Sequence, residues 1–374
     1  ESREGDEAGA AALLGTTTRA FAESIRSALT GSAAPRREPP PDVDAGARLE
    51  YLKYRHYSAT WSREGLRKAV AHLQRALEID PTYASAYEGL AWSLAVLGYW
   101  GFMPIAEAYP KAKAAALHAL ALDPSLSEAH TSLALVKWLH DWDLAGFRTE
   151  IATALDLNPN SAFARFLHGL FLATIERDRG GAVAEVRTLL DLDPLSPFSN
   201  FSAAFVLAFA GAYEEAAERA RRTLDLYPDV PLAMYALGWA EVGLGRFAEA
   251  LTVFEAAADR SPNPIGLSYV AFVAGRAGRE EAARALLERL TREAEEPLPA
   301  FARALSHIGL SDVDRAFDCL ERSLAGHDSR IFWFAVLPGL EMLREDPRFT
   351  DLWRRIMLAC AAPPPAARTG EAKS

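Results

Sequence analysis

Eight histidines and two cysteines are the side chains in this 374-residue sequence best suited to binding a metal ion or exchanging protons. A metal site on one helix needs two such residues three or four positions apart, because that spacing places both on the same face. No histidine here has a second histidine or a cysteine at that spacing. We therefore expect no metal site and no cofactor. The residues concerned are His56, His72, His118, His130, His140, His168, His307, His327, Cys319 and Cys360.

One short stretch, residues 140–143 (HDWD), places an imidazole beside two carboxylates. General acid–base catalysis also requires a pocket and a third positioned group, which this stretch does not supply. The acidic pairs Glu214-Glu215 and Glu280-Glu281 lie near expected helix starts, where the helix dipole favours negative charge. The sequence contains no nucleophile elbow, phosphate-binding glycine loop or kinase signature. We expect no catalytic residues and no enzyme activity.

A repeat of about 34 residues organises most of the chain and is clearest between Pro197 and Pro262. A fixed period of this length indicates stacked helix-turn-helix units. Small residues such as Gly238 let the paired helices approach closely, and aromatic residues such as Phe254 fill the space between units. Segments of the form Leu-x-Leu/Ile-x-Pro mark the ends of the units. They end at Pro81, Pro124, Pro159, Pro194 and Pro228, and with Pro262 added the intervals are 43, 35, 35, 34 and 34 residues.

The longer intervals locate insertions. The 43-residue interval contains extra sequence at Tyr99–Glu107, between the two helices of the second unit. Each 35-residue interval predicts one extra residue in the turn within a unit, near His140–Asp143 and near Arg177–Gly181. Beyond Pro262 the pattern weakens but supports a seventh unit and an eighth. We therefore expect the repeat array to span residues 45–328.

The segments at the two ends of the chain lack the repeat. Residues 1–30 are predicted to be an extension with a possible amphipathic helix, and the proline-rich residues 31–44 to be a linker. Two interpretations of that helix stay open: it docks on the array, or it covers only the first array helix or belongs to an upstream domain. Residues 329–360 are expected to cap the last unit, which otherwise exposes an apolar face. Residues 361–374 are expected to be a disordered tail.

Composition narrows the possible partners and compartments. A net charge of -10 and a pI near 5.4 argue against a nucleic-acid or anionic-membrane surface. No run of about 18 apolar residues occurs, so we expect no membrane span. The two cysteines offer no disulfide framework, which favours a reducing compartment, and we expect the cytoplasm. The chain opens at Glu1 without an initiator Met or signal peptide, so we expect it to be a piece of a longer protein.

The offsets of small and aromatic residues in the clearest unit carry a family resemblance. They are Leu237-Gly238, Gly245-Arg246-Phe247, Ala250, Phe254, Ala257 and Pro262. This spacing resembles the tetratricopeptide repeat (TPR) family. The resemblance implies an all-α, right-handed superhelix (an α-solenoid) of about eight helical hairpins, which serves as an interaction scaffold.

A second resemblance rests on segments outside the general repeat. They are residues 50–57 (EYLKYRHY), 65–69 (GLRKA), 122–130 (LDPSLSEAH), 141–143 (DWD), 191–197 (DLDPLSP) and 343–349 (LREDPRF). From about Ala45 to Leu358 the chain is similar to the TPR-rich C-terminal half of certain bacterial regulators. In those proteins the repeats follow a winged-helix DNA-binding domain, an adenylate/guanylate cyclase domain or a serine/threonine kinase domain. The resemblance implies a scaffolding or sensory module in signalling or transcriptional regulation.

In the family's geometry the first helix of each unit lines the concave side, and positions 2, 5, 9 and 12 point into it. These positions are mostly apolar or aromatic here, which predicts a partly exposed groove that binds a partner. The alternative is that part of this stripe is ordinary core between helices. Basic residues that would grip a peptide carboxylate are sparse, so an apolar or helical protein segment is the favoured ligand. The residues expected to bind it are Trp92, Leu135, Phe163, Phe166, Leu170, Phe198, Phe201, Phe205, Tyr235, Trp239 and Phe272.

The function predicted from sequence is therefore protein–protein interaction, with no nucleic acid bound by this region. Two alternatives stay open. One is a small-molecule or enzymatic use of the concave channel, which requires converging polar groups among the aromatic residues. The other is a self-association module, which would form a homodimer without any ligand.

Overall fold

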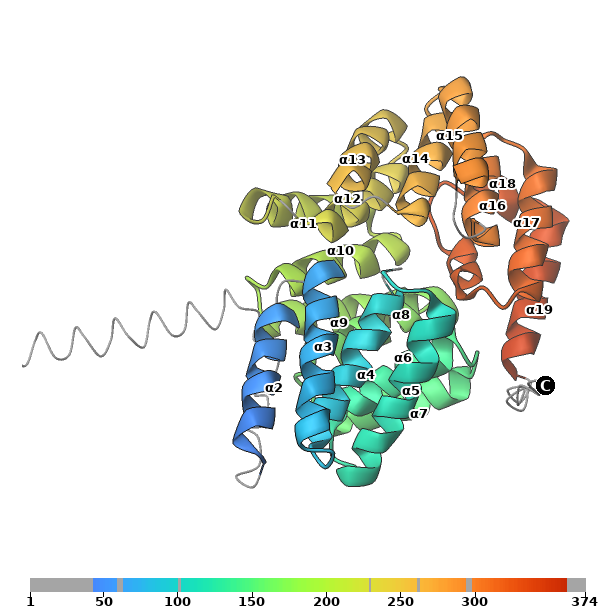
Figure 1. Cartoon of the computed structure of the whole chain (residues 1–374). Helices are drawn as coiled ribbons and strands as arrows, with labels where there is room; N and C mark the ends of the chain where they lie inside the picture. The colour runs from blue at the N-terminus through green and yellow to red at the C-terminus, as the bar shows by residue number, and fades with distance from the viewer. Residues whose placement is uncertain are drawn as a thin grey trace, which may run out of the picture.

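The computed structural model describes residues 43–58, 63–99, 102–228, 230–260, 263–293 and 298–361 (Figure 1). The predicted N-terminal helix, the linker up to residue 42, Pro262 and the tail from residue 362 lie outside the described residues. Within the described ranges every regular element is a helix, so the all-α prediction is confirmed.

Eight helical hairpins follow one another along the described chain, which confirms the predicted number. Their first helices are α2 (Ala45–Ser58), α4 (Ala84–Tyr99), α6 (Ser127–Leu139), α8 (Ala162–Phe171), α10 (Pro197–Phe209), α12 (Pro231–Gly243), α14 (Pro264–Arg276) and α16 (Ala300–Gly309). Their second helices are α3 (Arg63–Ile79), α5 (Ile105–Leu122), α7 (Leu144–Leu157), α9 (Arg179–Leu192), α11 (Tyr213–Leu226), α13 (Phe247–Arg260), α15 (Glu280–Glu293) and α17 (Val313–Ala325). After the array come η2 (Ser329–Ala335), α18 (Glu341–Arg344) and α19 (Pro347–Ala361).

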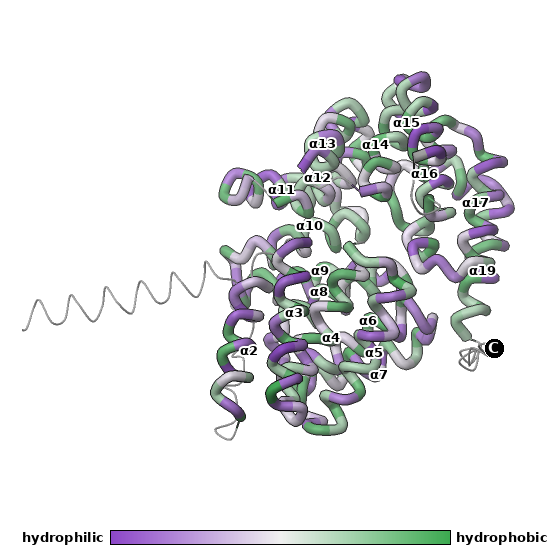
Figure 2. Tube along the Cα trace, viewed as in Figure 1, coloured by the Kyte–Doolittle hydropathy of each residue, from purple (hydrophilic) through white to green (hydrophobic). Residues whose placement is uncertain are grey.

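The hairpins stack so that first helices contact first helices of neighbouring units, as between α4 and α6 or α10 and α12. The first helices lie inside the array. In α12 every residue from Leu232 to Val242 is buried, whereas α11 buries only Ala216, Ala217, Ala220 and Thr223. Figure 2 shows the same contrast as apolar residues along the inner helices and polar residues on outer helices such as α3 and α11. A helix that is buried on all sides must be covered on its concave face as well.

The Asp-Pro or Asn-Pro after the second helices of the first four units ends each of these helices with a local hydrogen bond. The Asp80 carboxylate accepts from the backbone N–H of Thr82 at 3.0 Å. Asp123 accepts in the same way from Ser125 at 2.9 Å. These Asx turns satisfy a backbone donor where the helix stops, and the proline that follows the Asp cannot continue the helix. The repeated sequence signal is therefore a repeated turn.

Close helix packing explains the small residues of the repeat. Gly238 on α12 faces the ring of Phe254 on α13, and a Cβ at position 238 would overlap that ring. Ala250 and Ala257 are fully buried on the same second helix. The structure confirms the predicted contact between Gly238 and its partner helix.

In units three to eight the turn inside the unit contains one residue in the left-handed region. It is Gly211, Gly245 and Gly278 in units five to seven, with φ between 74° and 79°. Units three, four and eight use non-glycine residues at this place. These are Trp142, Arg177 and Ser311, with φ between 55° and 58°.

The longer units accommodate their extra residues in different ways. In the second unit α4 ends at Tyr99 and α5 begins at Ile105, so the insertion lies between the two helices as predicted. Its Phe102 and Met103 are half-buried against the core. In the fourth unit the prediction of an extra residue at Arg177–Gly181 is wrong. The residue is absorbed just before the turn as a single π-helical turn, η1 (Leu172–Glu176), which holds one residue more than an α-turn.

Candidate functional site: the concave face and the segment that fills it

The eleven side chains expected to line an exposed groove are all buried, with exposed fractions between 0 and 8%. They are Trp92, Leu135, Phe163, Phe166, Leu170, Phe198, Phe201, Phe205, Tyr235, Trp239 and Phe272. This corrects the expectation of a partly exposed stripe: in this structure the concave side chains form core. Two features of the fold cause the burial.

The first cause is tight winding of the early units. Trp92 of α4 lies 6.1 Å, centroid to centroid, from Phe163 of α8, although a whole unit separates the two helices. Tyr99 contacts Phe166 across the same gap at 6.1 Å. The concave residues of the second and fourth units therefore pack on one another.

The second cause is the chain's own C-terminal part, which runs over the concave face. We call residues 327–340 the inner segment. Its Trp333 lies 5.6 Å from the Trp138 ring on α6 and stacks on Phe209 of α10 at 5.8 Å. At its far end a Cβ on Gly339 would come within 3 Å of Val242 on α12 and Phe272 on α14. The inner segment therefore contacts units three, five, six and seven.

The region expected to cap the array does contact its last unit through α19. Arg355 makes a two-pronged ion pair with Glu321 of α17, with both N–O distances 2.7 Å. Phe349 of α19 packs on Phe334 of η2 at 4.7 Å. The same helix reaches back to the middle of the array, where the Arg177 guanidinium lies 5.0 Å above the Trp353 ring. In Figure 1, α19 accordingly returns towards the early units.

The inner segment begins at a stacked pair of strained residues. His327 and Trp142 both have φ in the left-handed region, at 55° and 58°. Their ring centroids are 4.0 Å apart with 25° between the planes, so the rings stack. The Phe332 ring also contacts the Trp142 indole, with 5.0 Å between the centroids. Bulky residues rarely adopt this backbone conformation, which persists where the surroundings stabilise it.

Two histidines, His140 and His327, lie at this junction. Burial lowers the pKa of His140 below its ordinary value, and Asp141 and Lys113 beside it act in opposite directions. Burial also lowers the pKa of His327, and the neighbouring His140 lowers it further. Both imidazoles are therefore favoured in the neutral form.

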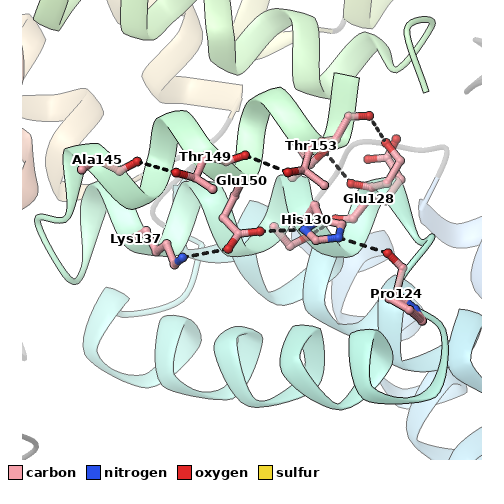
Figure 3. A network of polar contacts seen from close by, with 12 residues as sticks. Pro124, Glu128, His130, Lys137, Ala145, Thr149, Glu150 and Thr153 are labelled. Atoms are coloured by element: carbon pink, nitrogen blue, oxygen red, sulfur yellow. Dashed lines mark hydrogen bonds and ion pairs between the residues drawn. The ribbon is translucent and has the colours of Figure 1, made fainter. Parts of the chain in front are cut away.

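The other histidines near carboxylates bridge the two helices of a hairpin, as Figure 3 shows for the third unit. His130 of α6 contacts Glu150 of α7 at 2.6 Å, and Lys137 reaches the same carboxylate at 2.7 Å. In the fourth unit, Arg165 and His168 of α8 contact Glu185 of α9 at 2.9 and 2.8 Å. One helix pair after another is thus joined by a buried or half-buried ion pair.

The pKa shifts in these bridges follow from the contacts. Burial alone would raise the pKa of Glu150, but the hydrogen bonds from His130 and Lys137 hold it below its ordinary value. The same hydrogen bond raises the pKa of His130, although burial opposes it. Among the described residues no group of three His, Cys, Asp or Glu could hold a metal ion. These bridges stabilise hairpins, and their geometry suggests no catalytic role.

Sequence reasoning missed the residues that meet the inner segment: Trp138, Trp142 and Phe209. The 141–143 stretch was interpreted as a structural turn, and the aromatic run at 332–334 as part of a cap. One signal could have identified Trp142: it stands where three other units have glycine. A bulky side chain at a position that favours glycine indicates that its ring makes a contact worth the strain.

The chain is similar to known proteins in one stretch of its sequence and in its fold. A sequence model described as tetratricopeptide repeat matches residues 232–264. Human IFIT1, solved as a dimer with PPP-AAAA, superposes with a TM-score of 0.51 at 14% identity, over 82% of this chain and 81% of that one. Yeast Tom70 gives 0.47 at 16% identity, over 91% and 76%. The type IV pilus biogenesis factor PilW gives 0.43 at 21%, over 55% and 92%. No curated protein matches the chain in sequence.

At these identities the similarity concerns the fold alone. The stacked hairpins and the comparisons together define an all-α repeat protein of the α-solenoid class. One of its repeats, at residues 232–264, matches the tetratricopeptide repeat model. No helix among the described residues is both long enough and apolar enough to cross a membrane.

Proposed function

We propose that this chain is a cytoplasmic interaction scaffold or sensory module of a larger bacterial regulator, and that its concave face binds an apolar protein segment. The observation that carries the proposal is the inner segment itself. Phe332 is fully buried and Trp333 half-buried against first-helix aromatic residues. An apolar, aromatic-rich segment is therefore the chemistry that this face accommodates, and a partner of the same chemistry would compete for it.

The charges of the inner segment support an apolar partner. Asp328 and Arg330 pair with each other at 3.2 Å within the segment. The segment thus largely neutralises its own charges and relies on aromatic contacts with the array. A partner that replaces it would need aromatic side chains more than charged ones.

The regulator context rests on sequence. The segments at 50–57 and 343–349 resemble the TPR regions of bacterial regulators whose output domains precede the repeats. In such an arrangement, exchange of the inner segment for a partner would change the surface that the array presents to its output domain.

A peptide in trans tests the binding chemistry. The full chain carrying Trp333→Ala has a weakened inner segment, and a fluorescent peptide of residues 328–340 is titrated into it and into the wild type. We expect the variant to bind at least tenfold more tightly than the wild type, because its own segment competes less. A peptide in which both Phe332 and Trp333 are alanine serves as the control and should not bind. Circular dichroism verifies that the variant is folded, and absence of binding to it would overturn the proposal.

A further inference from the structure

A second feature lies away from the concave face. A cavity of about 520 Å³ opens between the last helices of the array, α15, α16 and α17. This volume is in the range of small-molecule sites, about 300–1,000 Å³. The residues that line it are Leu287, Glu288, Thr291, Arg292, Arg303, His307, Cys319 and Arg322.

The cavity differs in charge from the rest of the chain. Three arginines line it against a single glutamate, while the whole sequence carries a net charge of -10. Arginine guanidinium groups in a concavity attract oxyanions and bind them by paired hydrogen bonds. The charge of the cavity is thus opposite in sign to the net charge of the chain.

Two of these arginines have no acidic partner in the part of the chain that the structure describes. Neither Arg303 nor Arg322 forms an ion pair there, whereas Arg284 and Arg315 nearby pair with Glu280 and Asp312. The Arg303 Nε is buried and donates to no acceptor among the described residues. A buried donor without an acceptor is unfavourable, and the other guanidinium nitrogens of Arg303 also form no ion pair with the described residues.

His307 adds a second unused polar atom. Its Nδ1 is buried without a hydrogen-bond partner among the described residues, and the Asp312 carboxylate is 3.8 Å away. Burial lowers the pKa of His307; Asp312 opposes this, and Arg315 and Arg303 lower the pKa further. An anion near these groups would offset the repulsion between the arginines and favour the protonated imidazole.

We propose that this cavity binds a small phosphate-bearing anion, with Arg303 and Arg322 contacting the phosphate oxygens. Phosphate suits the site because its oxygens can accept from both guanidinium groups at once. Leu287 and Cys319 provide apolar wall for the remainder of the ligand. Glu288 on the same wall disfavours a second anionic group on that side.

Isothermal titration calorimetry of the full chain with inorganic pyrophosphate tests the site, in buffers of matched ionic strength. We expect saturable binding that weakens at least tenfold in Arg303→Met, which keeps the aliphatic stem but removes the donors. Arg322→Gln is the second variant. The Arg322 side chain is exposed, so we expect the variant protein to fold normally. The substitution should weaken pyrophosphate binding severalfold. Arg284→Gln is the matched control on α15 and should bind like the wild type.

Citrate distinguishes phosphate from carboxylate recognition. We expect citrate to bind at least tenfold more weakly than pyrophosphate. Equal binding of the two would overturn the assignment to phosphate. Absence of pyrophosphate binding to the wild type, or equal loss of affinity in Arg284→Gln, would overturn the site itself. Neither outcome bears on peptide binding at the concave face.

Discussion

The turns of the third and sixth units share one backbone conformation and use it differently. In the sixth unit the left-handed residue is Gly245, and a Cβ there would meet nothing within 4 Å. In the third unit it is Trp142, whose indole is 1% exposed between His327 and Phe332. An L-residue in this conformation costs roughly 1–2 kcal/mol, which the burial of an indole can offset. The departure from glycine thus marks a contact between parts of the chain that are not neighbours in the array.

The fourth and eighth units extend this comparison. Arg177 holds the same left-handed position and lies over Trp353, so it too contacts the C-terminal region. Ser311 holds it in the eighth unit but is exposed. Two non-glycine turns therefore make long-range contacts, whereas the residue at this position in the eighth unit is exposed.

Trp142→Gly should have the largest effect on stability. Loss of a buried indole lowers the free energy of unfolding by about 3–5 kcal/mol. Glycine removes the strain of the left-handed backbone, which restores about 1 kcal/mol. We therefore expect a net destabilisation of roughly 2–4 kcal/mol. Urea unfolding followed by circular dichroism measures it. A loss below about 1 kcal/mol would show that the ring does not hold the inner segment in place.

Gly238→Leu probes the core of the sixth unit, whose turn makes no long-range contact. The leucine would overlap Phe254, and overpacking of this kind costs roughly 1–3 kcal/mol. Thermal unfolding is the measurement. A melting temperature equal to that of the wild type would contradict the packing of α12 on α13.

Gly245→Ala tests the cost of the turn without any change in contacts. We expect a loss of roughly 1 kcal/mol, because alanine is strained at this φ and the site is open. Ser311→Gly is the reverse control in the eighth unit. Glycine removes the backbone strain of the folded state but also raises the conformational entropy of the unfolded chain. Because the first effect is larger at this φ, the substitution should stabilise the protein by about 0.5 kcal/mol. If Gly245→Ala lowers the free energy of unfolding and Ser311→Gly raises it, backbone strain and not side-chain contact determines the stability of these two turns.

The pH dependence of stability should be the smallest effect. The folded pKa values of His140 and His327 lie below 6.5, so their contribution is present above pH 6.5 and is lost as the pH falls through the folded values. His130 has the opposite sign: its raised pKa contributes below pH 6.5, and the contribution is lost as the pH rises through the folded value.

Unfolding free energies at pH 5.5 and 7.5 test these signs. His327→Gln should lose less stability on acidification than the wild type, and His130→Gln should lose more. Identical pH dependence in the two variants and the wild type would contradict the assignment of the shifts.

What could be predicted from the sequence follows local rules. The contact of Gly238 with Phe254 and the Asx turn at Asp80 each depend on residues close in sequence, so spacing alone identifies them. The exposure of Phe163 could not be predicted in this way. It depends on how tightly units two and four wind together and on where residues 327–340 lie, and no local period encodes either. The extra residue of the fourth unit was predicted in the loop after η1, whereas it lies within η1. The repeat length cannot distinguish the two positions, because a π-helical turn and a longer loop each add one residue.

The stacking of Trp142 on His327 also has a consequence for how the chain unfolds and how it is made. In an ordinary solenoid each unit touches only its neighbours, so stability is a sum of nearest-neighbour terms and the ends can fray independently. Here the third unit is coupled to residues that follow the eighth. Loss of the C-terminal region would thus loosen the middle of the array, which favours cooperative melting over fraying. During synthesis the third unit leaves the ribosome about 185 residues before its stacking partner, so the Trp142 indole stays unprotected until residues 327–340 have emerged.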